Sequence, residues 1–306
     1  MNNKLLSPIA AVAVALLVTF LWSTSFVIIK LGLAEIPPLT YAGLRYSIAF
    51  IVLLPLMFTK QRREEFKKLT KKDWRKLIAL GLVFYTFTQG AQFLGLSLLP
   101  AVTVSLLLNF TPVIVAVMGI FLINEKPSPL QWTGSLLFIA GVLVYFYPVM
   151  LNENQALGLI VMGFGVLANA SAAVIGRDIN RSSHLSPVTI TIISMGIGSV
   201  ILLVSGIVEQ GMPSISTTNI IYLLWLAVIN TALAFTLWNL TLRTLTAMES
   251  SIINGTMLIQ IAVLAWIFLG EPISFKEGIG MVIAAAGAML VQLKLKKKKF
   301  STQKVS

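Results

Sequence analysis

The chain has 306 residues, of which 57% are hydrophobic and only 11% are charged, and its formal net charge is +12. A soluble domain is about half apolar and about one quarter charged, so this composition excludes an ordinary soluble domain. The absence of cysteine excludes disulfides, thiolate metal sites and cysteine redox chemistry.

The apolar residues are gathered in runs of about 20, which is the length of a helix that crosses a bilayer. Only helices and closed barrels satisfy their backbone hydrogen bonds in lipid, and these runs are too long for barrel strands. The first run is also longer than a signal-peptide core, so we expect it to be retained. The sequence predicts an all-α membrane protein with ten transmembrane helices, at approximately 9–31, 38–58, 75–96, 100–123, 129–149, 156–176, 187–208, 218–239, 247–269 and 275–293.

Four of these spans begin with a helix-capping signal. In two of them a serine precedes a proline, which suits the first helical position. In the other two a hydroxyl residue precedes a Glu by three positions, which is the spacing of a capping box. The pairs are Ser128–Pro129, Ser186–Pro187, Thr246–Glu249 and Ser274–Glu277.

The distribution of Lys and Arg predicts the orientation of the spans. With the N-terminus in the cytoplasm, the cytoplasmic segments hold 20 of the 23 basic residues, and the outer loops hold only Lys276. Because cytoplasmic loops are rich in Lys and Arg, we expect a multi-pass protein of the cell membrane with both termini in the cytoplasm. No nucleic-acid partner is needed to explain the net charge, since no soluble basic domain is predicted.

One sequence segment of the first half of the chain recurs, in similar form, in the second half. FLINEKPSPLQWTG at 121–134 returns as IFLGEPISFKEGIG at 267–280, a shift of 146 residues. A unit of that length holds five spans, and because five is odd the second copy enters the membrane from the opposite side. We therefore predict two inverted five-helix repeats, at 1–150 and 151–293, followed by a basic cytoplasmic tail at 294–306. Inverted repeats are frequent in secondary transporters, where the substrate binds between them.

The repeated glutamates, Glu125 and Glu271, are expected at helix–helix corners, each beside the positive N-terminus of the following helix. The repeated glycines allow helices to approach closely in lipid. We interpret the repeated segment as a structural corner that closes each repeat, with a gating role as the alternative. It is not expected to bind the substrate.

The chain resembles the EamA-like family of the drug/metabolite transporter superfamily. The resemblance implies a cavity between spans 1–4 and 6–9, with spans 5 and 10 at the periphery, and transport of small metabolites, often export of amino acids. Two positions depart from the family pattern: Ser23 replaces a glycine, and Leu258 stands in the second copy where the first has Pro112. The likeness rests on Trp22-Ser23, Lys30-Leu31-Gly32, Pro38, Arg45, Pro112, and the repeated Glu125…Gly134…Gly141 and Glu271…Gly280…Gly287.

Polar side chains inside the predicted spans indicate where a solute binds, because each must be compensated in lipid or face a hydrated cavity. The clearest set is Tyr85, Gln89 and Gln92, which share one face of an α-helix. Such groups suit a zwitterionic or weakly charged solute, although they can also simply join helices by hydrogen bonds. The candidate substrate-binding residues are Trp22, Ser23, Arg45, Tyr85, Gln89, Gln92, Asn109, Asn169, Trp238 and Asn254.

Three charged residues leave alternatives open. Arg45 lies about 10 Å along the second span from its start, where it can reach the surface or bind a carboxylate in a cavity. Glu249 is the acid closest to a predicted cavity and is a candidate proton carrier, but its capping-box position also explains it. Lys30 is expected at the membrane interface.

The sequence contains no phosphate-binding loop, no G-x-S-x-G, no H-E-x-x-H and no histidine inside a predicted span. We therefore predict a non-enzyme without cofactor or metal, and interpret the chain as a secondary transporter. Its expected partners are a small-molecule substrate and the bilayer, with a homodimer through the peripheral helices as a further expectation. The alternatives are an uptake or exchange carrier for a sugar or nucleotide derivative, a membrane scaffold or signalling protein, and an embedded transferase.

Overall fold

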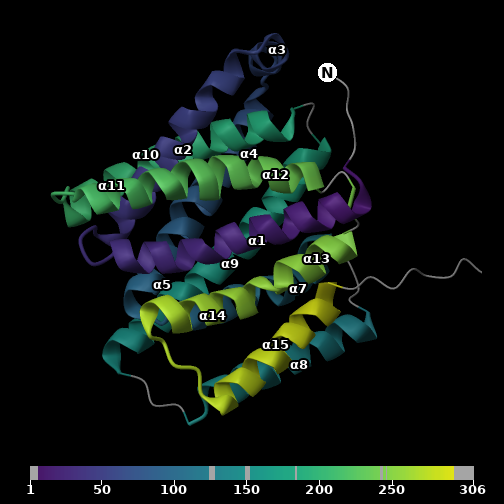
Figure 1. The fold of residues 1–306 in the computed structure, drawn as a ribbon. Helices are drawn as coiled ribbons and strands as arrows, with labels where there is room; N and C mark the ends of the chain where they lie inside the picture. Colours follow the sequence, from purple (N-terminus) through teal and green to yellow (C-terminus); the bar gives the residue numbers. More distant parts are fainter. Residues whose placement is uncertain are drawn as a thin grey trace, which may run out of the picture.

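The computed structural model describes residues 6–123, 128–148, 152–182, 185–241, 244–245 and 247–292. All regular elements within these residues are helical, and they form a single bundle (Figure 1). In chain order they are α1 (Pro8–Gly32), α2 (Pro38–Leu53), η1 (Leu54–Phe58), α3 (Lys60–Lys67), α4 (Lys71–Leu80), η2 (Gly81–Thr88), α5 (Gln89–Leu98), α6 (Ala101–Leu108), α7 (Thr111–Ile123), α8 (Pro129–Phe146), α9 (Glu153–Ser182), α10 (Pro187–Gln210), α11 (Thr217–Leu224), η3 (Trp225–Leu233), α12 (Ala234–Thr241), α13 (Ala247–Gly255), α14 (Met257–Leu269) and α15 (Phe275–Gln292).

Nine helices among the described residues, several made of consecutive elements, are long and apolar enough to cross a membrane. They lie on the first nine predicted spans; α1, for example, occupies Pro8–Gly32 where 9–31 was predicted. The tenth predicted span, 275–293, lies on α15, which is not among those nine. The protein is therefore an all-helical, multi-pass membrane protein.

Three of the four predicted helix starts lie in described residues, and all three are confirmed. The Ser128 hydroxyl accepts from the backbone N of Gln131 at 3.3 Å, and the Gln131 side chain accepts in return from the backbone N of Ser128 at 2.9 Å. Ser186 caps α10, and the capping box of Ser274 with Glu277 precedes α15. The fourth signal begins at Thr246, which lies outside the described residues.

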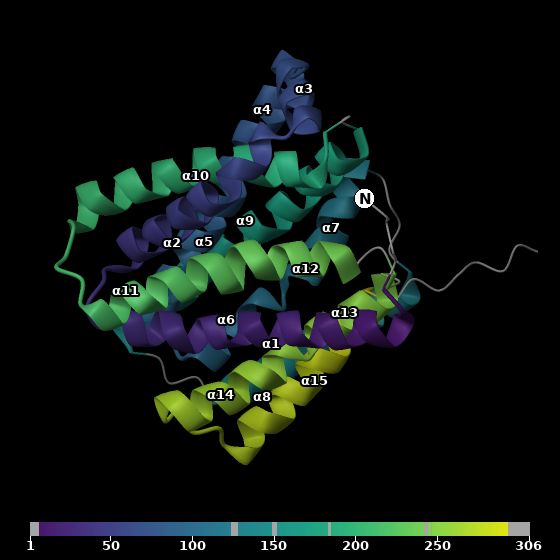
Figure 2. The same cartoon turned by 45° about the horizontal axis from the view of Figure 1, so that its top comes forward.

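Helices α8 and α15 pack side by side along one edge of the bundle, while α3 projects from the opposite edge (Figures 1 and 2). Their contact is lined by the repeated glycines. A Cβ atom built on Gly141 would lie 2.6 Å from the carbonyl O of Gly280, and one on Gly134 would lie 2.8 Å from that of Gly287. The two backbones are therefore in direct contact, which only residues without side chains permit.

Candidate functional site

A cavity of about 450 Å³ lies in the interior of the bundle, between helices from both halves of the chain. Seven of the ten candidate residues line it, and each half contributes. Ser25, Tyr46, Ser105 and Thr111 add hydroxyl groups to its wall. The seven are Trp22, Arg45, Gln89, Gln92, Asn109, Asn169 and Asn254.

Two helix interruptions lie at the wall of this cavity. The fourth span breaks at residues 109–110, between α6 and α7, and the ninth breaks at Thr256, between α13 and α14. At the first break Pro112 has no N–H to donate, and the Thr111 hydroxyl donates instead to the carbonyl O of Leu108 at 2.7 Å. At the second the Thr256 hydroxyl donates to the carbonyl O of Ile253 at 2.6 Å.

These breaks place the beginnings of α7 and α14 beside the cavity, since Thr111 and Met257 both line it. Each helix is 13 residues long, and the N-terminus of such a helix carries a partial positive charge. In transporters, interrupted helices near the midplane use these ends to bind anionic groups of the substrate. The wall of the cavity is therefore favourable to negative charge at two points.

Arg45 provides a full positive charge at the same wall. The residue is 5% exposed, so it does not extend to the membrane surface. Its Nε atom donates to the Thr231 hydroxyl at 3.1 Å, and its guanidinium carbon lies 5.2 Å from the centre of the Tyr46 ring. No Asp or Glu is present among the described residues that line the cavity. The guanidinium is thus left without a carboxylate partner at its cavity-facing end.

The structure does not bring together all three residues of the predicted third-span stripe. Gln89 and Gln92 line the cavity, but Tyr85 does not; it is 3% exposed and packs against Tyr46 and Phe84. The prediction assumed a continuous α-helix, whereas η2 is π-helical and rotates the residues before Gln89 relative to those after it. The Tyr46 hydroxyl instead reaches the cavity wall, where it donates to Gln89 Oε1 at 2.6 Å.

Ser23 and Trp238 are the other two candidates that do not line the cavity. Ser23 is fully buried, and its hydroxyl contacts the carbonyl O of Thr19 at 2.8 Å and Oε1 of Gln260 at 2.9 Å, so it joins α1 to α14. Trp238 lies behind Trp22, with ring centres 5.2 Å apart. Both residues support the wall rather than form it.

Sequence reasoning missed Thr231 and Tyr46, the two residues that hold Arg45. Thr231 directly follows Asn230, a polar pair inside an apolar span, which was the available signal. Asn230 itself is fully buried and donates to the carbonyl O of Leu21 at 2.6 Å and to the Ser25 hydroxyl at 2.8 Å. It therefore joins η3 to α1, as the interhelical alternative anticipated.

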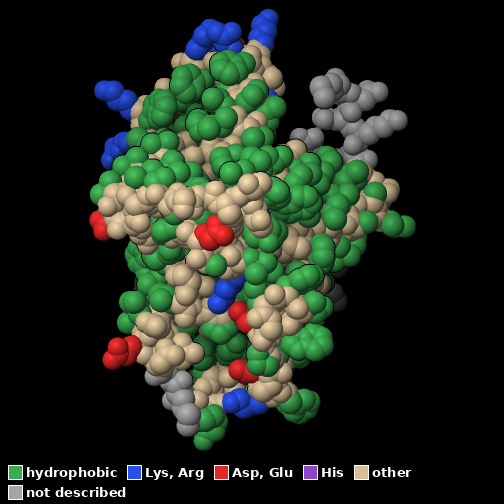
Figure 3. All heavy atoms as spheres, turned by 60° about the vertical axis from the view of Figure 1, so that its left-hand side comes forward, with side chains coloured by type: hydrophobic (Ala, Val, Ile, Leu, Met, Phe, Trp, Pro, Cys, Tyr) green, Lys and Arg blue, Asp and Glu red, His purple; other side chains and the backbone are tan. Residues whose placement is uncertain are grey.

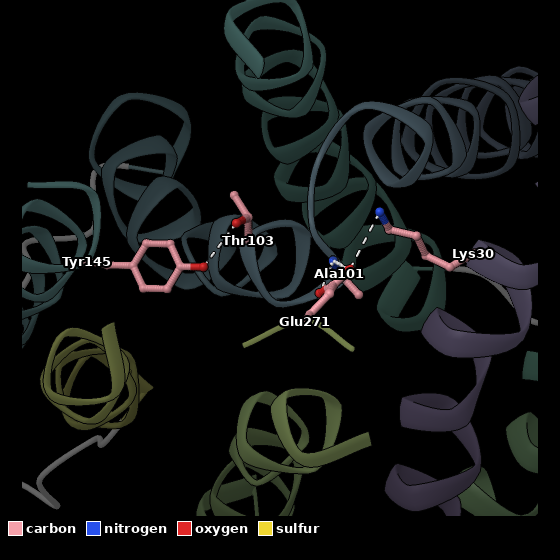
Figure 4. A network of polar contacts seen from close by, with 5 residues as sticks. All are labelled: Lys30, Ala101, Thr103, Tyr145 and Glu271. Atoms are coloured by element: carbon pink, nitrogen blue, oxygen red, sulfur yellow. Dashed lines mark hydrogen bonds and ion pairs between the residues drawn. The ribbon is translucent and has the colours of Figure 1, made fainter. Parts of the chain in front are cut away.

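Glu271 lies at the predicted corner, between the end of α14 at Leu269 and the start of α15 at Phe275, but its carboxylate contacts a different helix from the one expected. Its carboxylate accepts from the backbone N of Ala101, at 2.9 and 3.0 Å, so it caps α6 rather than the following helix α15. The Lys30 ammonium lies 3.5 Å from the same carboxylate (Figure 4). Beside this cluster, the hydroxyls of Thr103 and Tyr145 are 3.0 Å apart. The cluster ties α1, α6 and the end of α14 together. Glu125, the equivalent of Glu271, is outside the described residues.

Glu249, the predicted proton-carrier candidate, does not line the central cavity. It is exposed and borders a separate apolar groove of about 590 Å³ between α1 and Leu245. This position separates it from Arg45 and from the amide side chains of the cavity wall.

Comparison with known proteins supplies independent findings. The model of the EamA-like transporter family matches the chain twice, at residues 9–147 and 156–293. "Uncharacterized transporter YoaV" of Bacillus subtilis is 26% identical, over 89% of this chain and 93% of its own. "Probable amino-acid metabolite efflux pump" of Escherichia coli is 30% identical, over 73% of this chain and 75% of its own. A solved structure, described only as "Crystal structure of protein", has a TM-score of 0.66 at 15% identity, covers 92% of this chain and shares its fold.

Proposed function

This chain belongs to the EamA-like transporter family, and on that premise we propose that it exports amino acids or related carboxylates across the cell membrane by alternating access. The observation that carries the proposal is Arg45: a buried cation that lines the central cavity without a carboxylate among the cavity's described residues. Burial of an unpaired charge is costly, so a substrate carboxylate would supply the missing partner. The name of the Escherichia coli relative agrees with this substrate class.

The rest of the cavity wall fits a zwitterion better than a cation. The amide side chains of Gln89, Gln92, Asn169 and Asn254 offer carbonyl oxygens to an ammonium group but no negative charge. A substrate that carries only positive charge would meet Arg45 without compensation. We therefore propose that Arg45 binds the substrate carboxylate and that the amide groups orient the remainder.

We further propose that the fold consists of ten spans in two inverted repeats of five. Support comes from features that recur about 146 residues apart: the breaks at 109–110 and Thr256, the π-helical segments η2 and η3, and the glycine contacts of α8 with α15. Exchanging the two halves converts the Gly134–Gly287 contact into the Gly280–Gly141 contact. That exchange supports a two-fold relation between the halves, and in inverted repeats such an axis lies in the membrane plane.

The proposed orientation has both termini in the cytoplasm. The positive-inside rule supports it, because the basic segment of nine Lys and Arg between Lys60 and Lys76 would otherwise face outward. In Figure 1 the start of α1 and the end of α15 lie at the same end of the bundle, which an even number of spans requires.

The test uses purified protein in vesicles preloaded with one of three matched compounds: an amino acid, its carboxamide, and the amine left when its carboxylate is removed. We expect exchange of the amino acid and little exchange of the other two. Arg45→Gln should lower kcat/KM for the amino acid by about 30-fold or more, since loss of one partner of a buried charge pair costs about 2–5 kcal/mol. Arg45→Lys should retain part of the activity.

Arg75→Gln is the matched control, because Arg75 is exposed on α4 and does not line the cavity. Equal transport of all three compounds, or full activity in Arg45→Gln, would contradict the role of Arg45. If no carboxylate is transported but a sugar or nucleotide derivative is, the exchange-carrier alternative replaces the proposal. Transport of nothing, with the protein folded, would favour the scaffold alternative.

A further inference from the structure

A second cavity, of about 520 Å³, shares no lining residue with the central one and lies at the end of the α2–η1 span. Its wall is mostly apolar and comes from α2, η1, α3, α4 and α10, with Phe50, Leu54, Met57, Trp74, Ile193 and Ile197 among the apolar lining residues. We call this cavity the α3 groove, because α3 crosses beside it. Its volume is that of a site for a small molecule or one chain of a lipid.

Two cations border this apolar wall. Arg63 and Lys67 are four residues apart on α3, so they share one helical face, and both line the α3 groove. Lys67 lies 3.2 Å from Glu64, an exposed pair worth little, while the Arg63 side chain has no hydrogen-bond or acidic partner among the described residues. Figure 3 shows Lys and Arg side chains gathered over this end of the molecule, with hydrophobic side chains directly below them.

The surroundings place this arrangement at the membrane surface. The span ends at Phe58, which is 69% exposed, and the basic segment starts two residues later at Lys60. Phe66 and Trp74 pack edge to face with ring centres 5.9 Å apart, and aromatic side chains of this kind concentrate where lipid tails meet headgroups. An apolar groove below two cations, at the level where lipid tails meet headgroups, is complementary to a molecule with an apolar chain and an anionic head.

We propose that the α3 groove binds an anionic phospholipid of the adjoining leaflet, with an acyl chain against Phe50, Leu54 and Ile197 and the phosphate between Arg63 and Lys67. A lipid without net charge would leave Arg63, which has no acidic partner among the described residues, uncompensated, and would bring no net charge to the exposed Lys67–Glu64 pair. The basic C-terminal tail, 294–306, is excluded as the occupant by like charge. This site does not depend on the substrate of the central cavity.

The experiment measures lipid retention by native mass spectrometry on the full-length protein in detergent. Phosphatidylglycerol and phosphatidylcholine with identical acyl chains are added in increasing amounts. We expect the wild type to retain one phosphatidylglycerol in preference to phosphatidylcholine. Arg63→Gln/Lys67→Gln should weaken phosphatidylglycerol retention roughly 30-fold, because each cation at a membrane surface changes the affinity for anionic lipid about fivefold.

Lys68→Gln/Lys71→Gln is the matched charge control, since both residues are exposed in the same basic segment and neither lines the groove. Ile197→Trp fills the apolar part while keeping every charge, and Val204→Trp, on the exposed face of α10, is its control. Ile197→Trp should lower phosphatidylglycerol retention at least fivefold, and Val204→Trp should not.

Any one of four results would overturn the proposal. The first is equal retention of both lipids by the wild type, and the second is an equal loss in the two charge variants. The third is displacement of the bound lipid by inorganic phosphate alone, which would assign the cations to a free anion. Retention confined to dimers would likewise assign the groove to a contact between copies.

Discussion

The carboxylate of Glu65 joins α3 to the beginning of α10. Its Oε2 atom accepts from the backbone N of Ser186 at 3.1 Å, from the Ser186 hydroxyl at 2.9 Å, and from the Thr189 hydroxyl. Burial acts to raise the pKa of Glu65, but the hydrogen bonds from Thr189 and Ser186 outweigh it and leave the pKa below its usual value. The charged form of Glu65 therefore stabilises the folded protein.

We expect Glu65→Gln to lower the free energy of unfolding by about 1–3 kcal/mol at neutral pH, because several donors lose a charged acceptor. A carboxyl group whose pKa is lowered by folding stabilises the folded protein at pH values above its pKa in the unfolded chain. This stabilisation is lost as the pH falls through its pKa in the folded protein. The difference between variant and wild type should therefore shrink below about pH 4. Unfolding in detergent at a series of pH values measures it.

Glu64→Gln is the neighbouring control, since the Glu64 side chain is 51% exposed and pairs only with Lys67 among described residues. If Glu64→Gln were as destabilising as Glu65→Gln, the loss would reflect net charge and not the contact with α10.

Residue types could be predicted from the sequence, but side-chain directions only in part. Arg45 was left open between the surface and a cavity, and the structure places it in the cavity because Thr231, from a distant span, holds its Nε atom. The separation of Tyr85 from Gln89 and Gln92 could not be predicted, because no sequence signal marked the π-helical segment η2. The contact of Ser23 with Gln260 could not be predicted either, because the two residues are 237 positions apart in the chain.

At the scale of elements, the contact of α8 with α15 depends on the absence of side chains at four glycines. We expect Gly141→Ala to destabilise the protein by about 1–3 kcal/mol, because the added methyl group would lie 2.6 Å from the carbonyl O of Gly280 and the helices would have to separate. Thermal unfolding in detergent measures the change.

Gly163→Ala is the matched control on α9, where an added Cβ meets nothing within 4 Å. There alanine should be neutral or stabilising by about 0.5–1 kcal/mol, since glycine is unfavourable inside a helix. Equal behaviour of the two variants would show that close approach of α8 and α15 is not required.

The elements themselves could be predicted well, because long apolar runs and capping residues are local signals. Ser128, Ser186 and Ser274 each marked a helix start that the structure contains. The breaks inside the fourth and ninth spans could not be placed in the same way. The first break lies beside Pro112, but the second has Leu258 at the equivalent position and lies at Thr256.

For the whole molecule, the predicted orientation in the membrane decides which segments face the cytoplasm and which face outward. The chain has no cysteine, so single cysteines can be introduced without background. We expect cysteines at Asn154, exposed in the first turn of α9, and at Ser214, exposed between α10 and α11, to react in intact cells with an impermeant maleimide. A cysteine at Lys68, in the basic segment, should react only after the cells are opened. The reverse labelling pattern would invert the proposed topology.

The pairing of α8 with α15 also has a consequence for how the chain is made. About 130 residues separate the end of α8 at Phe146 from the start of α15 at Phe275, and their synthesis takes roughly 6–26 s at about 5–20 residues per second. During that interval the glycine face of α8 has no partner in the bilayer. The helix that packs against the glycine face of α8 is therefore synthesised last. A chain whose synthesis stopped before α15 would expose that face of α8 to the insertion and quality-control machinery.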